Sequence, residues 1–386
     1  MNADYDVAIL GAGLAGLSLA VRLAEPRFAG LRVLIAEPRT EYRRDRTWSY
    51  WALHPHPFQA AVASSWDRWA VVANGRAVMC RAPGLRYESI PADAFYRSAL
   101  DLVRAAPHID MRSGVAASAA EDADGVTIRF GREETRASVA FDTRPPTGPR
   151  HGLTQVFGGL EIETTDAVFD PDIATLMDFR GVSAGAAHFT YVLPSTSRRA
   201  LVEDTWFAPA GFRPPDHRAA VREHMLARHG VVDFAVLFEE RGALPMDPVF
   251  RPHPGTRLLP FGTAGGATRP STGYAFNAVQ AQCDEAAAAL AAGRPPMPAR
   301  ARPAMVRMMD RTLLSLLERR PELAPHIFAS LFDRCEPGAL VRFLNDRARP
   351  ADLAAVAAAI PFIPAVAAAA RLALGSTRWS RPAVAG

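Results

Sequence analysis

The sequence contains no lysine, although it has 44 basic residues, all of them arginine. This absence excludes chemistry that depends on a lysine amine, such as a Schiff base with pyridoxal phosphate or a P-loop of the Walker type. Cysteine is also scarce, and Cys80, Cys283 and Cys335 are too far apart in the sequence to form a CxxC pair. We therefore expect neither a disulfide framework nor a metal site, and reduced thiols of this kind are typical of a cytoplasmic protein.

The chain also lacks a strong excess of charge. Its 44 basic and 40 acidic residues give a formal net charge of +4, and because the arginines are dispersed, nucleic-acid binding is not supported. A mild attraction to anionic lipid remains open. The first predicted strand begins within a few residues of Met1, which leaves no room for a signal peptide. A length of 386 residues favours two or three domains.

The first motif is a glycine-rich turn near the start of the chain, in the segment DVAILGAGLAG at residues 6–16. The apolar run Val7–Leu10 predicts a buried parallel strand, and the residues after the turn have the apolar spacing of a helix. In a dinucleotide-binding fold, Gly11 allows the tight turn, Gly13 admits a pyrophosphate, and Gly16 lets the helix pack against the strand. The free N–H groups at the start of that helix are suited to binding phosphate.

An acidic residue follows the second predicted strand, where a nucleotide-binding fold needs one. The strand at residues 31–36 ends in Glu37, 21 residues after Gly16, and a carboxylate there is expected to bind a ribose 2′-OH. This favours FAD or NAD over NADP, but the spacing alone does not separate FAD from NAD. Ala12 and Arg39 complete this part of the predicted cofactor site. The alternative is a glycine-rich turn that binds nothing.

A second glycine-rich loop, within residues 257–273, precedes a second predicted helix at 274–292. A loop that leads into a helix N-terminus is again suited to an anion or a flavin. The cofactor-binding residues predicted in this loop are Gly265, Gly266, Thr272 and Gly273. Many flavoproteins have a Gly-Asp pair in the corresponding segment, but here Thr263 follows Gly262.

One further cofactor-site candidate, Asp142, lies at the end of a predicted strand, in the sequence Asp142-Thr143-Arg144. A strand that ends in this way resembles the point where two-domain flavoproteins close their FAD-binding domain, although an ordinary strand-end turn is an equal alternative. The Asn74-Gly75 pair predicts a tight hairpin. Branched and aromatic residues cluster over residues 153–207, which predicts a mostly antiparallel sheet.

These patterns predict an α/β fold with a Rossmann-type FAD-binding domain, interleaved with a substrate domain on a mostly antiparallel sheet, and followed by a C-terminal helical region. The predicted FAD-binding domain consists of residues 1–52, 91–148 and 251–294, the substrate domain of 53–90 and 149–250, and the helical region of 295–386.

The helical region contains a nearly continuous apolar stretch at residues 351–374. Pro361 and Pro364 interrupt it and alanine adds little hydrophobicity, so it does not read as a transmembrane helix. Trp379 and its neighbouring arginines would suit a helix end at a membrane surface. A core helical hairpin broken at Pro361 is the alternative.

Four stretches together resemble the bacterial lycopene β-cyclases. They are RTWSYW at 46–51, HFTYVLPST at 188–196, LVEDTWF at 201–207 and RPSTGYAFNAV at 269–279. The resemblance implies FAD that is active in its reduced form, with NAD(P)H as the electron donor, and a peripheral association with the membrane. It implies that the ψ end groups of lycopene are cyclised to β-rings, giving β-carotene via γ-carotene in an isomerisation without net redox change.

The acidic pair Glu203-Asp204 lies within a predicted apolar strand, where carboxyl groups are costly to bury unless they are used or paired. Because neighbouring strand residues point to opposite faces, only one of the two should face the substrate. The resemblance favours Glu203 as the acid or base, with Asp204 as a structural group or the alternative acid. Such a carboxylic acid can protonate a polyene if burial raises its pKa. His188 is expected to be packed or solvated rather than catalytic.

Two other functions stay open from the sequence. The first is an FAD-dependent monooxygenase or reductase that acts on an apolar substrate, since it would share the glycine motif and the domain layout. The missing Gly-Asp pair and the acidic pair at Glu203 argue against it. The second is a flavin- or lipid-binding module without catalysis, which leaves the buried acidic pair unexplained.

Overall fold

A largely parallel sheet forms around the first strand in the computed structural model, which describes residues 3–145, 152–179, 185–246, 255–298 and 301–360. Its strand order is β8-β2-β1-β11-β10-β9, and β17 also pairs with β11. The strands are β1 (Tyr5–Leu10), β2 (Val33–Glu37), β8 (Ile109–Ser113), β9 (Ser118–Glu121), β10 (Val126–Phe130), β11 (Glu133–Asp142) and β17 (Leu258–Pro260). Strands β8, β2, β1, β11 and β17 pair in parallel.

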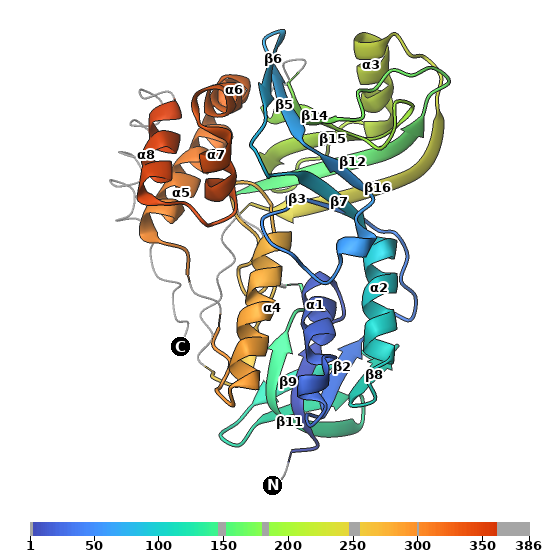
Figure 1. Ribbon diagram of the computed structural model, residues 1–386, viewed down its shortest axis with the longest axis vertical. Coiled ribbons are helices and arrows are strands. Elements are labelled where there is room, and N and C mark those ends of the chain that lie inside the picture. The colour runs from blue at the N-terminus through green and yellow to red at the C-terminus, as the bar shows by residue number, and fades with distance from the viewer. Residues whose placement is uncertain (1–2, 146–151, 180–184, 247–254, 299–300, 361–386) are drawn as a thin grey trace.

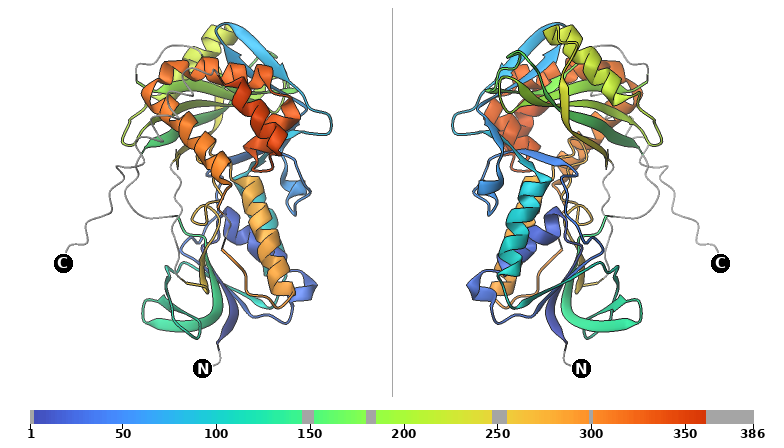
Figure 2. Two further views of the ribbon diagram at one scale, coloured as in Figure 1. Left: turned by 90° about the vertical axis from the view of Figure 1, so that its left-hand side faces the viewer. Right: turned by 90° about the vertical axis from the view of Figure 1, so that its right-hand side faces the viewer.

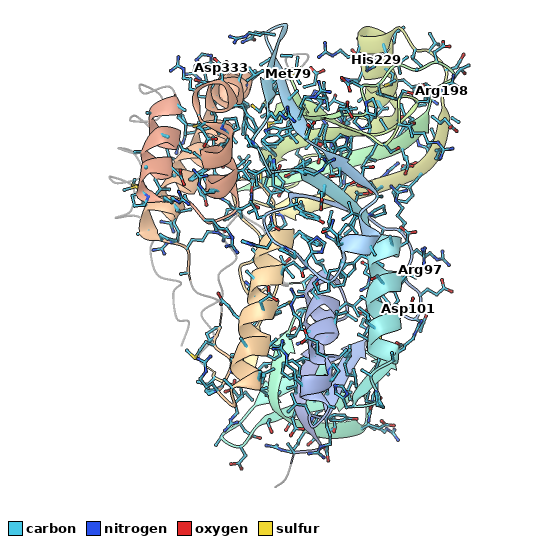
Figure 3. The ribbon with its side chains drawn as sticks, in the orientation of Figure 1. Met79, Arg97, Asp101, Arg198, His229 and Asp333 are labelled. Carbon is cyan, nitrogen blue, oxygen red and sulfur yellow. The ribbon has the colours of Figure 1, made fainter. Side chains whose placement is uncertain are left out.

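Three helices cover one face of this sheet: α1 (Leu14–Leu23), α2 (Ala92–Arg104) and α4 (Phe276–Ala291). Because strand side chains alternate between faces, Val7 and Ile9 pack against the helices, whereas Ala8 and Leu10 pack on the other face with β10. Helix α1 is buried along nearly its whole length, whereas α2 is amphipathic, because its apolar residues recur with the helical period. On α2, Phe95 is buried, whereas Arg97 and Asp101 point to solvent (Figure 3).

The second large sheet is mostly antiparallel and has the order β16-β12-β15-β14-β13-β5-β6. Its strands are β5 (Arg68–Ala73), β6 (Arg76–Cys80), β12 (Leu153–Glu163), β13 (Ile173–Asp178), β14 (Ala187–Pro194), β15 (Arg199–Pro209) and β16 (Ala235–Pro245). The predicted hairpin is confirmed, because Asn74 and Gly75 connect β5 to β6 with positive φ angles of 52° and 75°. Helix α3 (His217–His229) packs on one face of the sheet.

A small sheet of order β3-β7-β4 lies between the two large sheets (Figure 1). It consists of β3 (Thr47–Trp51), β4 (Ser64–Trp66) and β7 (Tyr87–Pro91). Short 3₁₀ turns occur at Pro26–Phe28, Gln59–Ala61 and Pro321–Leu323. The small sheet therefore links the parallel sheet to the face of the antiparallel sheet opposite α3.

Four helices of the C-terminal region pack beside the antiparallel sheet (Figure 2). They are α5 (Ala304–Arg319), α6 (Ala324–Arg334), α7 (Pro337–Leu344) and α8 (Pro350–Ala359). The predicted helical region is thus divided, and Pro337 and Pro350 each start a helix at its first position, where a missing N–H is tolerated. Among the described helices, none is long and apolar enough to cross a bilayer. The predicted features at Pro361, Pro364 and Trp379 lie outside the described residues.

Candidate functional site

The first glycine turn leaves open space above the N-terminus of α1. Gly11 has a φ of 98°, and its N–H donates to the carbonyl of Ala36 at 2.8 Å, which joins the turn to β2. A Cβ atom at Gly16 would lie 1.9 Å from the carbonyl oxygen of Gly11, so the helix packs on the turn with no room for a side chain. At Gly13, by contrast, the nearest atom to an added Cβ is Nη2 of Arg39 at 4.0 Å. An anion can therefore approach Gly13, as a dinucleotide pyrophosphate requires.

Glu37 lies at the end of β2 beside this turn. Its carboxylate is buried and accepts hydrogen bonds from the N–H of Ala12 at 2.5 Å and from Nε of Arg39 at 2.9 Å. Burial acts to raise the pKa of Glu37, but the hydrogen bonds from Arg39 and Ala12 outweigh it, so the pKa lies below its usual value. The structure thus brings Ala12, Glu37 and Arg39 together. The Glu37 carboxylate is the ionised hydrogen-bond acceptor, and Ala12 and Arg39 hold it against the glycine turn.

Asp142 lies at the same edge of the sheet. It ends β11 in register with Leu10, and its two carboxylate oxygens accept from Arg144 at 2.7 Å each. Thr143 donates to the carbonyl of Leu10 at 2.9 Å, which holds this strand end against the first turn. Asp142 is therefore near the glycine turn, but its carboxylate is bound by Arg144.

The second glycine loop connects β17 to α4 and packs against the first. A Cβ atom at Gly262 would lie 2.4 Å from Cβ of Ala15 in α1, so the two segments are in contact. A Cβ at Gly265 would lie 2.6 Å from a backbone oxygen, whereas Gly266 has a φ of 77° and open space around it. The loop therefore contacts α1 at Gly262, and of the predicted residues Gly265 packs on its own loop whereas Gly266 has open space.

The end of this loop reaches the antiparallel sheet. Gly273 has a φ of 73°, and an added Cβ would lie 3.0 Å from Oε1 of Gln155 on β12. This Oε1 atom is shielded from solvent and has no hydrogen-bond partner among the described residues. Thr272 accepts a hydrogen bond from the N–H of Tyr274 at 3.3 Å, which shapes the turn. An acceptor without a donor beside a glycine loop fits a bound group with an N–H.

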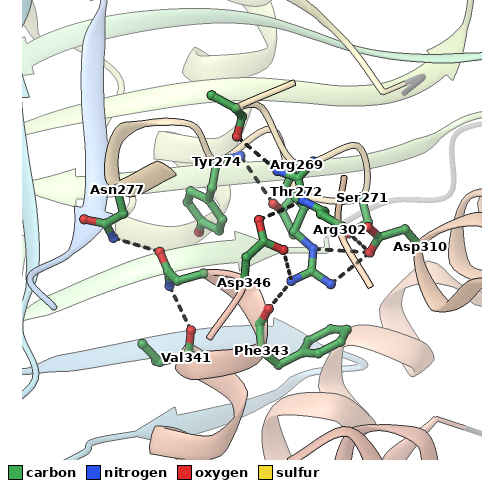
Figure 4. A network of polar contacts seen from close by, with 12 residues as sticks. Arg269, Ser271, Thr272, Tyr274, Asn277, Arg302, Asp310, Val341, Phe343 and Asp346 are labelled. Carbon is green, nitrogen blue, oxygen red and sulfur yellow. Dashed lines mark hydrogen bonds and ion pairs between the residues drawn. The ribbon is translucent and has the colours of Figure 1, made fainter. Parts of the chain in front are cut away.

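A buried arginine ties this loop to the C-terminal helices (Figure 4). Arg269 is 1% exposed, and its guanidinium donates to Asp310 of α5 at 2.9 Å and to the carbonyl of Phe343 in α7. Ser271 donates to the same carboxylate at 2.8 Å. Arg302 donates to the carbonyl of Gly266 at 3.0 Å. The loop is therefore held from outside by the helical region.

Removal of one partner from this buried ion pair is expected to destabilise the protein strongly. In Asp310→Ala the buried guanidinium of Arg269 loses its nearer carboxylate and keeps only Asp346 at 3.5 Å, and the loss of one partner from a buried pair typically lowers the free energy of unfolding by about 3–5 kcal/mol. Asp333→Ala is the matched control, because Asp333 pairs with Arg76 on the surface, where a change of about 0–1 kcal/mol is expected. Denaturant unfolding of both variants tests this, and equal stabilities would contradict it.

Glu203 lies on β15 on the face of the antiparallel sheet opposite α3. Its strand neighbours Leu201 and Phe207 pack in the same core as Trp51 and the C-terminal helices. Glu203 is buried, and burial, the charge of Glu240 and a side-chain hydrogen bond to Glu240 raise its pKa well above the usual value. These surroundings favour the protonated form of Glu203, which is the form that a general acid needs.

Asp204 points to the other face, as the strand alternation predicts. Its carboxylate accepts from Nε1 of Trp206 at 2.8 Å and contacts Nε2 of His188 at 2.5 Å. The ring of His188 stacks on Trp206 with centroids 4.0 Å apart. The structure therefore separates Asp204 from Glu203, and its carboxylate is fully occupied by two side chains.

Aromatic side chains surround Glu203 on its face of the sheet. Tyr191 is its neighbour in register on β14, and the hydroxyl groups of Tyr191 and Tyr87 are 2.7 Å apart. The ring of Trp51 packs against both Tyr87 and Tyr274, with centroids 4.8 and 5.3 Å away. Aromatic faces of this kind stabilise a nearby cation by about 0.5–2 kcal/mol each.

The comparison with known families decides what kind of protein this is. A family model described as lycopene cyclase protein matches residues 6–370. The chain belongs to this lycopene cyclase family. A curated lycopene beta-cyclase from Paracoccus sp. is 30% identical over 290 residues, which cover 70% of this chain and 70% of that protein.

Solved structures share the fold of this lycopene cyclase family member at low identity. A geranylgeranyl bacteriochlorophyll reductase-like protein from Thermoplasma acidophilum is 17% identical, with a TM-score of 0.62 over 96% of this chain and 98% of that one. A flavoprotein/dehydrogenase from Cytophaga hutchinsonii is 14% identical, with a TM-score of 0.60 and 96% and 99% coverage. HpxO from Klebsiella pneumoniae, solved with FAD and uric acid, is 18% identical, with a TM-score of 0.61 and 90% and 97% coverage. The predicted flavoprotein fold is confirmed.

Three polar residues of the site in this lycopene cyclase family member were not predicted from the sequence: Gln155, Glu240 and Thr47. Gln155 gave no signal, because a single glutamine in a strand is common. Glu240 did have a signal in the sequence, because Glu239-Glu240 is a second acidic pair in a strand, like Glu203-Asp204. Thr47 became a partner of Glu240 only through the tertiary fold, with a hydrogen bond of 2.9 Å.

Proposed function

We propose that the protein is a lycopene β-cyclase that uses FAD and converts the ψ end groups of lycopene to β-rings, giving β-carotene via γ-carotene. The observation that carries this proposal is the buried carboxyl group of Glu203, which has a raised pKa and aromatic neighbours on the same face. Membership of the lycopene cyclase family supports the substrate class. The reaction is an isomerisation, because a proton is added at one carbon and removed at another.

The residues of the glycine turns fit FAD. Gly11 and Gly16 would shape the turn so that the pyrophosphate approaches Gly13 at the start of α1, and the Glu37 carboxylate would bind a ribose hydroxyl in exchange for part of its contact with Arg39. The open space at Gly13 and the unpaired acceptor of Gln155 support this assignment. When bound in its reduced form, FAD would supply an anionic ring that stabilises positive charge in a dry site. NAD(P)H is the proposed source of the electrons.

In the proposed mechanism Glu203 delivers a proton to the terminal double bond of the ψ end group. The aromatic residues Trp51, Tyr87 and Tyr191 would then stabilise the tertiary cation and exclude water while the ring closes. Loss of a ring proton to a carboxylate completes the β-ring. Asp204 has a structural role in this scheme, because His188 and Trp206 occupy its carboxylate.

The location of the substrate suggests where the protein works. Lycopene partitions into bilayers, so we propose a cytoplasmic protein that is peripherally associated with the membrane through the C-terminal region. The finding that no described helix could span a bilayer is compatible with this. We also retain the division into an FAD-binding domain, a substrate domain and a C-terminal region as a proposal.

The proposed function is tested by incubation of the purified protein with lycopene, FAD and a reductant, followed by analysis of the pigment. We expect cyclised products whose mass equals that of lycopene, and no cyclisation without reductant. A product with added oxygen would indicate a monooxygenase, and one with added hydrogen a reductase. Either result would contradict the proposal.

A further inference from the structure

The carboxyl group of Glu203 lies next to the buried carboxyl group of Glu240, because the residue of β12 between them is Gly159, which has no side chain. Glu203 on β15 and Glu240 on β16 both pair with Gly159 of β12, which lies between them. Two strand spacings separate the outer strands by about 9.6 Å, so the side chains have to reach across β12 to touch. A Cβ atom at position 159 would lie 2.7 Å from Cγ of Glu203. The absence of a side chain at Gly159 therefore gives the two carboxyl groups room to form their hydrogen bond.

We propose that Glu203 and Glu240 share one proton across Gly159, and that Glu240 is the positioning residue that keeps Glu203 protonated. This inference rests on the proposed function for the role of Glu203, but the shared proton itself is independent of any substrate. Neither the family match nor the acidic motif at Glu203 assigns a role to Glu240.

The surroundings of the pair decide which carboxyl group holds the proton. The hydroxyl of Thr47 donates to Oε2 of Glu240 at 2.9 Å, so Glu240 is the acceptor in that hydrogen bond. Among the described residues, neither carboxyl group has an ion-pair partner. Glu240 is 3% exposed, so two negative charges at this point would be unfavourable and only one group ionises.

The other titratable groups on this face leave that balance unchanged. From β14, the hydroxyl of Tyr191 faces Glu203, and burial raises its pKa far above neutral, so it stays uncharged. Tyr87 of β7 and Tyr274 of the second glycine loop are neutral for the same reason. On β12 the next acidic residue is Glu161, which is already paired with Arg44.

The shared proton has a consequence for the reaction cycle. When Glu203 gives its proton to the substrate double bond, a C–H bond forms and the pair carries two negative charges opposite the new cation. The cyclised cation then loses a ring proton, its C–H electrons form the ring double bond, and the proton returns to the pair. Protons and electrons balance, and the doubly charged pair is both a stabilising anion and a strong base.

The experiment compares Glu240→Gln with Glu239→Gln in the flavin-loaded protein. Glu239 is the matched control, because it is adjacent on β16 but binds Arg218 and Arg241. Infrared spectra over a pH series, without carotene, report the protonated buried carboxyl group. We expect Glu240→Gln to move the pH at which this protonated carboxyl signal disappears downward by about one unit or more. Glu239→Gln should leave that pH unchanged. Thr47→Val, which removes the donor to Glu240, should move it upward.

The pH dependence of cyclisation is the second readout. In Glu240→Gln the carboxyl group of Glu203 ionises more easily, so activity should be lost at a lower pH than in the wild type. Glu240→Asp should restore part of the wild-type profile. Unchanged infrared titration in both Glu240→Gln and Thr47→Val would overturn the shared proton. Failure of the proposed function would be seen separately, as absence of cyclised pigment with the wild type.

Discussion

Glu203→Gln is expected to abolish cyclisation while the protein remains folded and retains its flavin. Glutamine keeps the size of the side chain and its hydrogen bond to Glu240, but it cannot donate and recover a proton. General acid–base groups typically contribute about 10²–10⁴-fold to a rate. The loss should reach or exceed the upper end of this range, because Glu203 is buried and water is not available as a substitute donor.

Asp204→Asn is the comparison that separates chemistry from structure. The residue is adjacent on the same strand and also buried, but it points toward α3 and binds His188 and Trp206. We expect it to weaken stability and to retain turnover. The measurement is the rate of β-ring formation per bound flavin, under reducing conditions, for both variants. An active Glu203 variant with an inactive Asp204 variant would move the catalytic role to Asp204, and two active variants would make the pair structural.

Gly13→Val is expected to remove flavin binding and to leave the fold intact. An added side chain at Gly13 meets nothing closer than Arg39 at 4.0 Å, and the residue has a φ of −84°, which valine can adopt. The side chain would instead occupy the space through which a pyrophosphate approaches the N-terminus of α1. Flavin absorbance of the purified protein measures the loss, and circular dichroism measures the fold.

Gly30→Val is the matched control for this substitution. Gly30 is exposed, has no atoms near an added Cβ, and follows the C-terminal end of α1, whereas the glycine turn precedes the N-terminal end. It should therefore bind flavin as the wild type does. If a folded Gly13 variant kept its full flavin absorbance, the first glycine turn would not be the pyrophosphate site. Gly16 is unsuitable for this test, because any side chain there would collide with the turn itself.

The parts of the fold that were predictable from the sequence are those with local causes. The strand, turn and helix at residues 5–23 follow from a branched apolar run, glycines at fixed spacing and a helical period. The hairpin at Asn74-Gly75 follows from two residues that tolerate positive φ. The opposite orientation of Glu203 and Asp204 follows from the alternation of strand side chains.

The parts that were not predictable depend on which distant segments become neighbours. Glu203 and Glu240 meet only because β15 and β16 both pair with β12 at Gly159. The sequence of a single strand does not determine the register in which it pairs with its neighbours. The pairing of Arg269 with Asp310 likewise joins a loop to a helix that begins about thirty residues later.

The buried arginine at position 269 limits how the polypeptide can be divided. Asp310 and Phe343 come from α5 and α7, and Asp346 from the segment between α7 and α8, so a chain that stopped after α4 would lack both carboxylates that pair with this guanidinium. We therefore expect the part of the chain up to α4 to be less stable when it is expressed without the C-terminal helical region. Deletion mapping of the proposed lipid contact has to begin beyond Asp346. Transfer of the second glycine loop into another flavoprotein would also have to include the helices that hold it.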